Sequence, residues 1–152
     1  MNKNQNPGAR KSPEERGAEP FALNIDVATM QNEDFRRVVW TGCNLQATLM
    51  CIPVGGEIGI ENHEGNDQFI KIVSGRAAVA MGCNRDCRDF KGHLTNGSAV
   101  FIPEGTWHNV VNTGSRPLKL YSVYAPPHHP KNAVQRQAES GKEKHDECRE
   151  CR

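Results

Sequence analysis

The sequence has few aromatic residues, no long apolar run and no excess of charge of one sign. Aromatic residues make up 6% of its 152 residues, and apolar runs such as Ala99–Ile102 are only a few residues long. Because a membrane-spanning helix needs about 20 mostly apolar residues, no such helix is expected. The 19 basic and 18 acidic residues leave a formal net charge of +1. With this balance, the protein lacks the excess of positive charge that would attract nucleic acids or anionic lipids, so neither is expected as a partner.

The beginning of the chain also lacks an apolar stretch. Residues 1–20 contain no Leu, Ile, Val or Phe, whereas a secretory signal peptide needs an apolar segment after its basic residues. We therefore expect a cytoplasmic protein, whose thiols stay reduced. The six cysteines are then not expected to form a disulfide framework. They are Cys43, Cys51, Cys83, Cys87, Cys148 and Cys151.

The core-forming residues are concentrated in the middle of the chain. Of the 29 Leu, Ile, Val and Phe residues, 28 lie between Phe21 and Pro130, and residues 131–152 contain only Val134. A segment of about 110 residues can bury a hydrophobic core without disulfides. We therefore expect one folded domain over residues 21–130. Residues 1–20 are expected to form a disordered N-terminal tail and residues 131–152 a flexible, cysteine-containing C-terminal tail.

From Arg37 onward, short β-rich runs alternate with Gly, Pro, Asn and Asp. Only Val27–Arg36 favours a helix. The clearest strand signal is Leu118–Tyr124, where apolar and other residues alternate with a period of two. Many short strands at close spacing predict an all-β protein, built as an antiparallel sandwich or small barrel. The expected strands are Val38–Trp40, Leu45–Pro53, Glu57–Asn62, Gln68–Val73, Arg76–Met81, Arg88–Lys91, Ala99–Ile102, His108–Asn112 and Leu118–Tyr124.

Two short segments carry residue types that bind metal ions. Glu61 and His63 are two apart in an expected strand, so their side chains should share a face. His108 follows the turn Pro103-Glu-Gly105, which can deliver an imidazole to the start of a strand. Two imidazoles and one carboxylate form the ligand set of mononuclear non-haem iron or manganese sites, and they also suit zinc. The alternative is that these are ordinary surface or hydrogen-bonded histidines, since the chain has six.

The two segments together resemble the two signature motifs of the cupin superfamily. The second motif matches fully, with Gly97, five residues, Pro103-x-Gly105, two residues, His108, three residues and Asn112. The chain that follows, over residues 105–127, is similar to small single-domain cupins described as mannose-6-phosphate isomerase-like. The resemblance implies a jelly-roll fold, the antiparallel double-stranded β-helix of the cupin barrel.

The first motif, from Gly56 to Gly75, departs from the family pattern at two positions. Glu61-Asn-His63 stands where the family usually has His-x-His, and Gln68 stands where it has Glu. Carried over by position, the resemblance implies one divalent metal ion (Mn, Fe, Zn or Ni) with Glu61, His63, Gln68 and His108 as ligands. Gln68 offers either an amide oxygen to the ion or only a supporting hydrogen bond. Asp67 is the competing residue, because a shift of one position would turn it inward instead.

The resemblance implies metal-dependent isomerisation or oxygenation of a small polar, sugar-like metabolite. Glu61 is then the ligand that could also act as a catalytic proton acceptor. The alternative function is a non-catalytic binding module for a metal ion or a small carbohydrate-like ligand. A third is a redox or metal-sensing protein, in which Cys83 and Cys87 share a zinc ion with Cys148 and Cys151.

The remaining expectations concern assembly and packing. Small barrels of this kind commonly pair through sheet edges, so a homodimer is expected. Trp107, Phe69, Phe101 and the two tyrosines are expected in the core or in a cavity wall. Arg36 and Arg37 are expected to form a solvated pair of charges.

Overall fold

The computed structural model describes residues 13–139 as one short helix and nine strands. Expectations about residues 1–12 and 140–152, including Cys148 and Cys151, lie outside the described residues. The elements are α1 (Ile25–Gln31), β1 (Arg36–Thr41), β2 (Gln46–Ile52), β3 (Asp67–Ser74), β4 (Ala77–Gly82), β5 (Phe90–Leu94), β6 (Ala99–Ile102), β7 (Trp107–Asn112), β8 (Leu118–Ala125) and β9 (Val134–Gln135).

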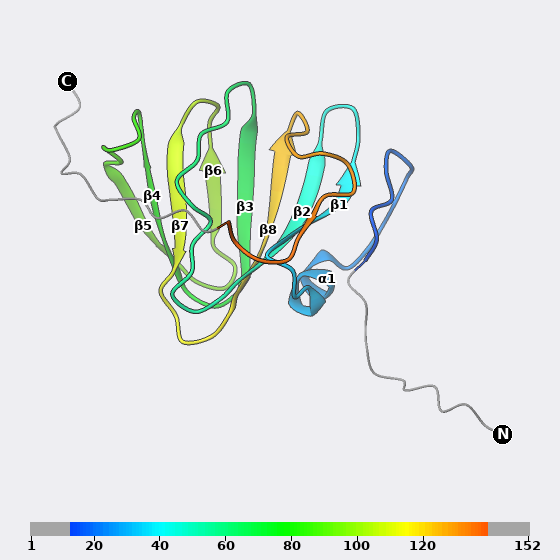
Figure 1. Ribbon diagram of the computed structural model, residues 1–152, viewed down its shortest axis with the longest axis horizontal. Coiled ribbons are helices and arrows are strands. Elements are labelled where there is room, and N and C mark those ends of the chain that lie inside the picture. Colours follow the sequence, from blue (N-terminus) through cyan, green and yellow to red (C-terminus); the bar gives the residue numbers. More distant parts are fainter. Residues whose placement is uncertain (1–12, 140–152) are drawn as a thin grey trace.

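The strands form two antiparallel sheets, which confirms the expected all-β cupin barrel. The larger sheet has the order β6-β3-β8-β2-β1-β9, and the smaller sheet has the order β5-β4-β7. Figure 1 shows the smaller sheet beside the larger one, with β7 lying next to β6 in the view. Neighbours in each sheet are mostly far apart in sequence, so the fold depends on contacts that close long loops.

The space between the sheets is apolar at one end and polar at the other. On β8, the side chains of Leu118 and Leu120 join the hydrophobic core, whereas Ser122 and Tyr124 further along the same face are buried polar residues. The same change occurs on β3, where Ile70 and Ile72 are in the core. Gln68, one alternation earlier on β3, belongs to the polar end. The period of two therefore gives the barrel a polar chamber above a packed hydrophobic base.

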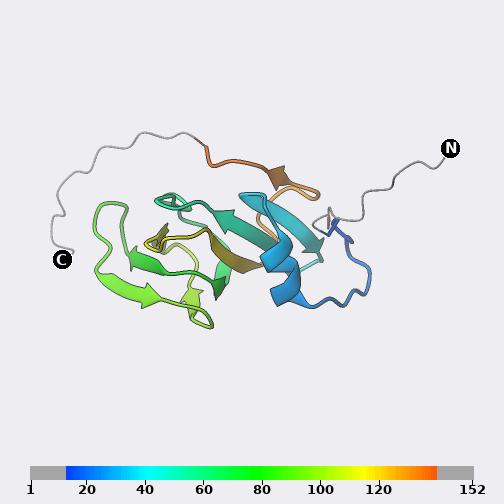
Figure 2. The same cartoon turned by 90° about the horizontal axis from the view of Figure 1, so that it is seen from below.

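Helix α1 covers the outer side of the larger sheet. The side chain of Asn24 accepts a hydrogen bond from the backbone of Val27 and so caps the helix at its N-terminus. Ala28 packs in a second apolar cluster with Val39 of β1 and Leu49 of β2. Figure 2 shows the helix and the segment that carries β9 on opposite sides of this sheet. Over residues 13–139, no helix is long and apolar enough to cross a membrane.

Several expectations about individual elements are wrong. The helix ends at Gln31 instead of continuing to Arg36, and Arg36 begins β1. Residues 57–62 form two isolated bridges instead of a strand. Gly59 explains the interruption, because its φ of 100° lies outside the extended region that a strand requires. The strand β9 lies beyond Pro130 and pairs with β1.

Two side chains also lie where the sequence did not predict them. Phe101 is 73% exposed on β6, at the edge of the larger sheet, rather than in the core. Arg36 is not solvated, since its side chain is only 12% exposed. Strand register explains both positions, because it decides on which side of the sheet each side chain lies.

Candidate metal centre

Backbone pairing places Glu61 beside His108. The amide of Glu61 donates to the carbonyl of His108 at 3.0 Å, and the amide of His108 donates to the carbonyl of Glu61 at 2.9 Å. This reciprocal pair is an isolated antiparallel bridge between the loop and β7. Residues paired directly across antiparallel chains project to the same side. The two side chains therefore share a face, although Glu61 is not in a strand.

The turn of the second motif holds His63 in place. The amide of Gly105 donates to the carbonyl of His63 at 3.0 Å, so the Pro103–Gly105 turn and the first motif are joined. The φ of Gly105 is 70°, which favours glycine in this tight turn. Both imidazoles are buried, with His63 5% and His108 0% exposed. Two motifs some 40 residues apart thus meet at the polar end of the barrel.

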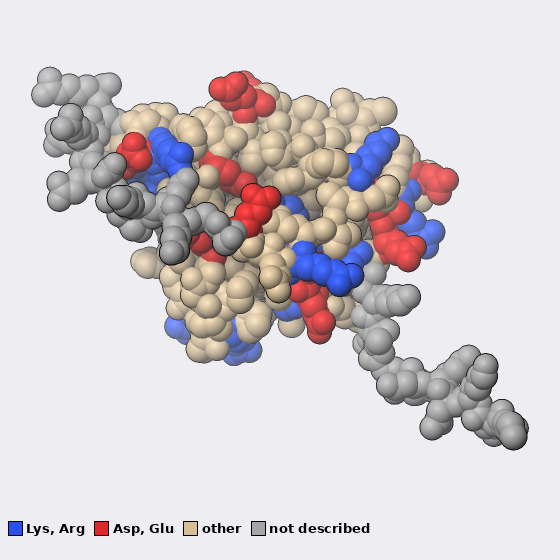
Figure 3. All heavy atoms as spheres, viewed as in Figure 1, with Lys and Arg blue, Asp and Glu red and all other residues tan. Residues whose placement is uncertain are grey.

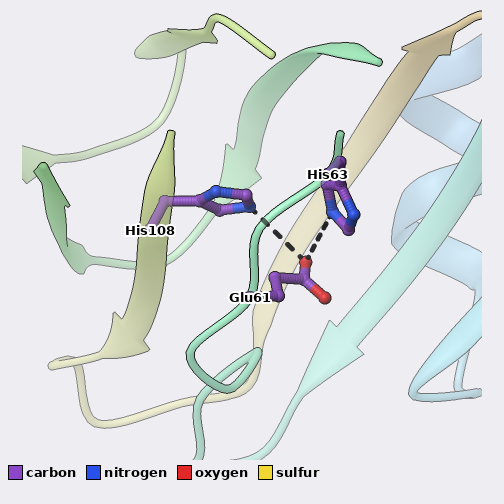
Figure 4. A group of neighbouring side chains, drawn as sticks. All are labelled: Glu61, His63 and His108. Atoms are coloured by element: carbon purple, nitrogen blue, oxygen red, sulfur yellow. Dashed lines mark ion pairs between the residues drawn. The ribbon is translucent and has the colours of Figure 1, made fainter. Parts of the chain in front are cut away.

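The three side chains converge on one point, as Figure 4 shows. Glu61 Oε1 lies 3.4 Å from His63 Nε2 and 3.6 Å from His108 Nε2. Their possible ligand atoms all lie within 4.8 Å of one another. His108 Nδ1 lies 2.8 Å from the carbonyl of Thr106, which fixes the proton on Nδ1 in the neutral ring. A neutral imidazole nitrogen and a carboxylate oxygen repel each other at this distance, so either a proton or a metal ion between them would stabilise the pair.

Gln68, not Asp67, points into the barrel. Gln68 Nε2 donates to Ser122 Oγ at 2.9 Å and to the hydroxyl of Tyr124 at 3.2 Å. Asp67 is exposed, and its Oδ1 accepts a hydrogen bond from the amide of Glu104 at 3.0 Å. Pairing of Gln68 with Tyr124 in the β3–β8 register decides between the two residues.

Among the described residues, thirteen buried side-chain nitrogen and oxygen atoms have no hydrogen-bond partner, and each of the four expected ligands contributes at least one of them. Those that can bind an ion are Glu61 Oε1, His63 Nε2, His108 Nε2 and Gln68 Oε1. Buried polar groups are nearly always paired, because an unpaired one costs about 1–3 kcal/mol. A divalent ion would bind the ligand atoms of Glu61, His63 and His108 together, since these lie within 4.8 Å of one another. The donor set fits such an ion, and one carboxylate with two imidazoles is compatible with Mn, Fe, Zn or Ni.

The carboxylate of Glu61 is ionised at neutral pH. Burial opposes its ionisation, but the contacts with His108 and His63 and the positive charge of Arg36 outweigh it. The pKa of Glu61 therefore lies well below its ordinary value of 4.5. Arg36 Nη2 lies 3.9 Å from Glu61 Oε2, the oxygen that does not face the histidines. The site thus combines one negative and one positive side chain.

Four other residues lie around the site, and of these the sequence predicted only that Tyr124 is in the core or a cavity wall. Arg36 is one, and Tyr124, His128 and His129 are the others. The ring of His128 lies 4.0 Å from that of His63 between centroids, and His129 packs edge-on against Tyr124 at 4.9 Å. The two histidines lie in the run Ala125-Pro-Pro-His-His-Pro130, which has no strand or helix periodicity. Gln46 holds this run, since its Oε1 accepts the amides of His128 and His129 at 3.1 and 2.8 Å.

His129 is expected to make stability depend on pH in the mildly acidic range. Burial and the charge of Arg36 lower the pKa of His129 from 6.5 to about 4. Between these values the unfolded chain binds a proton that the folded chain does not, so stability should fall as the pH is lowered. The depressed pKa of Glu61 acts separately, because its stabilising effect is lost only below its ordinary value of 4.5. In His129→Gln, the midpoint temperature Tm should change less between pH 6.5 and 4.5. An unchanged profile would contradict this role of His129.

A groove reaches the site from the side of Glu61. Its lining includes Arg36, Glu61, Arg88, Lys91, Gln135 and Glu139, and it has a volume of about 1840 Å³. Pockets for small molecules usually measure about 300–1,000 Å³, so the groove has room for a small ligand. His63 and His108 do not line it. Figure 3 shows acidic and basic side chains interspersed over the face of the described surface seen in Figure 1.

Residues 48–124 match the profile of the cupin domain family. The uncharacterized protein YrkC of Bacillus subtilis is 50% identical over 118 residues, which are 78% of this chain and 63% of YrkC. The chain therefore spans less than two thirds of that relative. An uncharacterized protein of Acanthamoeba polyphaga mimivirus is 36% identical over 123 residues, covering 80% of this chain and 75% of its own.

Solved structures share the fold. The crystal structure of BH2720 from Bacillus halodurans has 50% sequence identity and a TM-score of 0.80, and the match covers 81% of this chain and 93% of that one. KdgF from a Halomonas species has 22% identity and a TM-score of 0.55, with 61% of this chain and 78% of that chain covered. The similarity to KdgF concerns the fold alone.

Proposed function

The chain belongs to the cupin family, and from this premise we propose that it is a metal-dependent protein that acts on a small polar metabolite. The observation that carries the proposal is the convergence of three buried, unpartnered ligand atoms, which belong to Glu61, His63 and His108. Gln68 Oε1 is a further buried atom without a partner and is proposed as the fourth ligand. Cupins bind diverse small molecules, and the groove beside Glu61 offers such a molecule a way to the site. We infer that the reaction is an isomerisation or an oxygenation.

Each proposed ligand would have its own role in holding the ion. Glu61 would hold the ion through Oε1, and the Thr106 carbonyl would keep His108 Nε2 free for it. Gln68 Oε1 would add a neutral oxygen, oriented by the hydrogen bonds of its Nε2 with Ser122 and Tyr124. A bound divalent ion acts as a Lewis acid that polarises oxygen atoms of a substrate.

A non-catalytic binding module is the second candidate, and the acid–base properties of the site favour it. A general base works best with a pKa near the working pH. The pKa of Glu61 lies far below neutrality, and burial raises the pKa of Tyr124 to about 12. Neither group is suited to removing a proton at neutral pH. An activity screen over several metal ions and sugar phosphates separates the two candidates, since only an enzyme would give turnover that requires Glu61.

The metal content of the purified full-length chain tests the proposal. We expect one divalent ion for each chain when the protein is produced without added metal and analysed by mass spectrometry for elements. Removal by a chelator and re-addition should restore the same ratio. A chain that holds no ion after either treatment contradicts the proposal.

We also propose that the protein is a homodimer joined through the edge strand β6. An edge strand leaves backbone groups available for pairing, and Phe101 adds an apolar side chain there. Among the described residues its ring contacts that of Phe69, at 5.2 Å between centroids. Phe101→Glu should convert the dimer to a monomer, measured by light scattering at micromolar concentration. Phe90→Glu, at a 57% exposed residue on β5, is the matched control and should leave the mass unchanged. A monomeric parent chain contradicts the proposal.

A further inference from the structure

We propose that Arg36 binds the carboxylate group of a small anionic molecule beside the metal centre. This inference names the class of ligand and rests on the proposed function of the site. It concerns a residue that neither motif contains. Its support comes from the open hydrogen-bonding edge of Arg36, the charge of the site and the groove that reaches it.

The guanidinium of Arg36 is hydrogen-bonded on one side only. Its Nη1 donates to Gln135 Oε1 at 3.2 Å, and Gln135 lies directly opposite it in the β1–β9 register. Its Nε and Nη2 are buried and make no hydrogen bond of good geometry within residues 13–139, and the hydroxyl of Tyr124 is the neighbouring group that interacts with the guanidinium. A guanidinium stays charged at physiological pH, so it cannot avoid the free-energy cost of buried, unpaired N–H groups by losing a proton. Two unpaired, charged N–H groups in a buried place indicate a partner that binds from outside the chain.

The open groups match a carboxylate in shape. Nε and Nη2 lie on one edge of the planar guanidinium, where their N–H bonds are parallel and can meet two oxygens at once. Glu61 does not occupy this edge, because its Oε2 is 3.9 Å from Nη2 and beyond hydrogen-bond distance. Glu61 Oε1 faces the two histidines. A single edge with two donors can pair with the two oxygens of a carboxylate, and inorganic phosphate is the competing anion that can pair with it in the same way.

The charge of the site favours the same class of ligand. The positive charge of Arg36 and the negative charge of Glu61 cancel, and His129 is neutral at neutral pH because its pKa is lowered to about 4. A divalent ion would therefore leave the site with an excess of positive charge. Charges attract each other more strongly away from bulk water, so an anion would bind more tightly at this site than at an exposed surface.

Arg36 also lies in the wall of the groove, where its buried Nε and Nη2 become available to a carboxylate once the neighbouring side chains move. The groove is lined by both Arg36 and Glu61, and by Gln135, which anchors Arg36. A molecule that enters it meets the guanidinium and the carboxylate of the metal centre together. A hydroxy acid or an oxo acid suits this position, because it carries a carboxylate and a neighbouring oxygen of the kind that divalent ions bind.

Calorimetric titration of the metal-loaded full-length chain tests the inference with defined probes. Acetate, glycolate and pyruvate supply carboxylates, and ethylene glycol is the neutral counterpart of glycolate. We expect at least one carboxylate to bind and ethylene glycol not to bind. Arg36→Gln should weaken carboxylate binding by about tenfold or more, since it removes a charge-assisted pair of hydrogen bonds. Arg36→Lys, which keeps the charge but lacks the planar edge, should weaken it several-fold.

Arg37→Gln is the matched control. Arg37 is the next residue, but its Nε donates to Asp34 Oδ2 at 2.7 Å, so its removal should leave carboxylate binding unchanged. Binding that is equal in the parent, Arg36→Gln and Arg36→Lys overturns the inference. Absence of binding by all three carboxylates overturns it as well. Arg36-dependent binding of inorganic phosphate that is tighter than any carboxylate overturns the assignment of the ligand class. If Arg36→Gln does not fold, Arg36→Lys decides.

Metal content, measured on the same samples by competition with a chelator, separates this inference from the proposed function. A parent chain that binds metal but no carboxylate contradicts only the role of Arg36. A parent chain that binds no metal contradicts the proposed function. Arg36-dependent carboxylate binding by that metal-free chain would still support the role of Arg36.

Discussion

Replacing His63 or His108 by alanine is expected to weaken metal binding by about 100-fold or more. Even residues that only support a ligand cost about 10–100-fold in metal affinity when they are changed, so loss of a ligand should cost at least as much. The two imidazoles supply two of the three ligand atoms that converge at the site. The double variant should therefore hold almost no metal at micromolar concentration. Affinity is measured by competition with a chelator of known strength.

The histidine variants need a control for folding and for surface binding. His93 is exposed on β5, so His93→Ala should bind metal like the parent. Circular dichroism and thermal unfolding of each metal-free variant show whether the barrel is intact. Stoichiometric metal binding by a folded double variant would show that the ion lies elsewhere.

Glu61→Gln is expected to cause a comparable loss, whereas Gln68→Glu is not. Glu61 is the only anionic group among the proposed ligands, and Gln68 is neutral. Removing one partner of a buried charge pair costs about 3–5 kcal/mol, and about 3 kcal/mol corresponds to a roughly 100-fold weaker affinity. Gln68→Glu adds a negative charge, and the hydroxyls of Ser122 and Tyr124 can turn to donate to it. Its metal affinity should equal or exceed that of the parent.

Two further variants decide which carboxylate matters. The double change Glu61→His with Gln68→Glu recreates the commoner cupin ligand set and should bind metal about as well as the parent. Asp67→Asn is the matched control, because Asp67 is exposed and accepts its hydrogen bond from the amide of Glu104. Its metal affinity should not change. The assignment of Glu61 fails if Asp67→Asn loses the metal and Glu61→Gln keeps it.

Features that depend on residues close together in the sequence were predictable from the sequence. The strands of the core were predictable, because residues of the core face alternate with residues of the other face, as they do along β8 (Leu118–Ala125). The turn before His108 was also predictable from local residues, since Pro103 fixes its own φ and Gly105 readily adopts the positive φ of 70° that it has in the structure. Residues 57–62 were wrongly expected to form a strand, because alternation alone does not show that Gly59 leaves the extended region.

The surroundings of the site depended on pairing between distant parts of the chain. Gln68 rather than Asp67 points inward because β3 pairs with β8 in one register. Arg36 is buried because β1 takes up β9 at its edge and Gln135 reaches its side chain.

By itself, the sequence determined the all-β class, the cupin motifs and the residue types of the candidate metal centre, since these depend on neighbours within a few positions. Only the tertiary structure decided that Glu61 meets His108, that Arg36 turns inward and that His128 packs on His63. The physical reason is that strand register and loop closure act over tens of residues. A shift of one residue moves a side chain from the chamber to the outer surface, and no local pattern records which register is chosen.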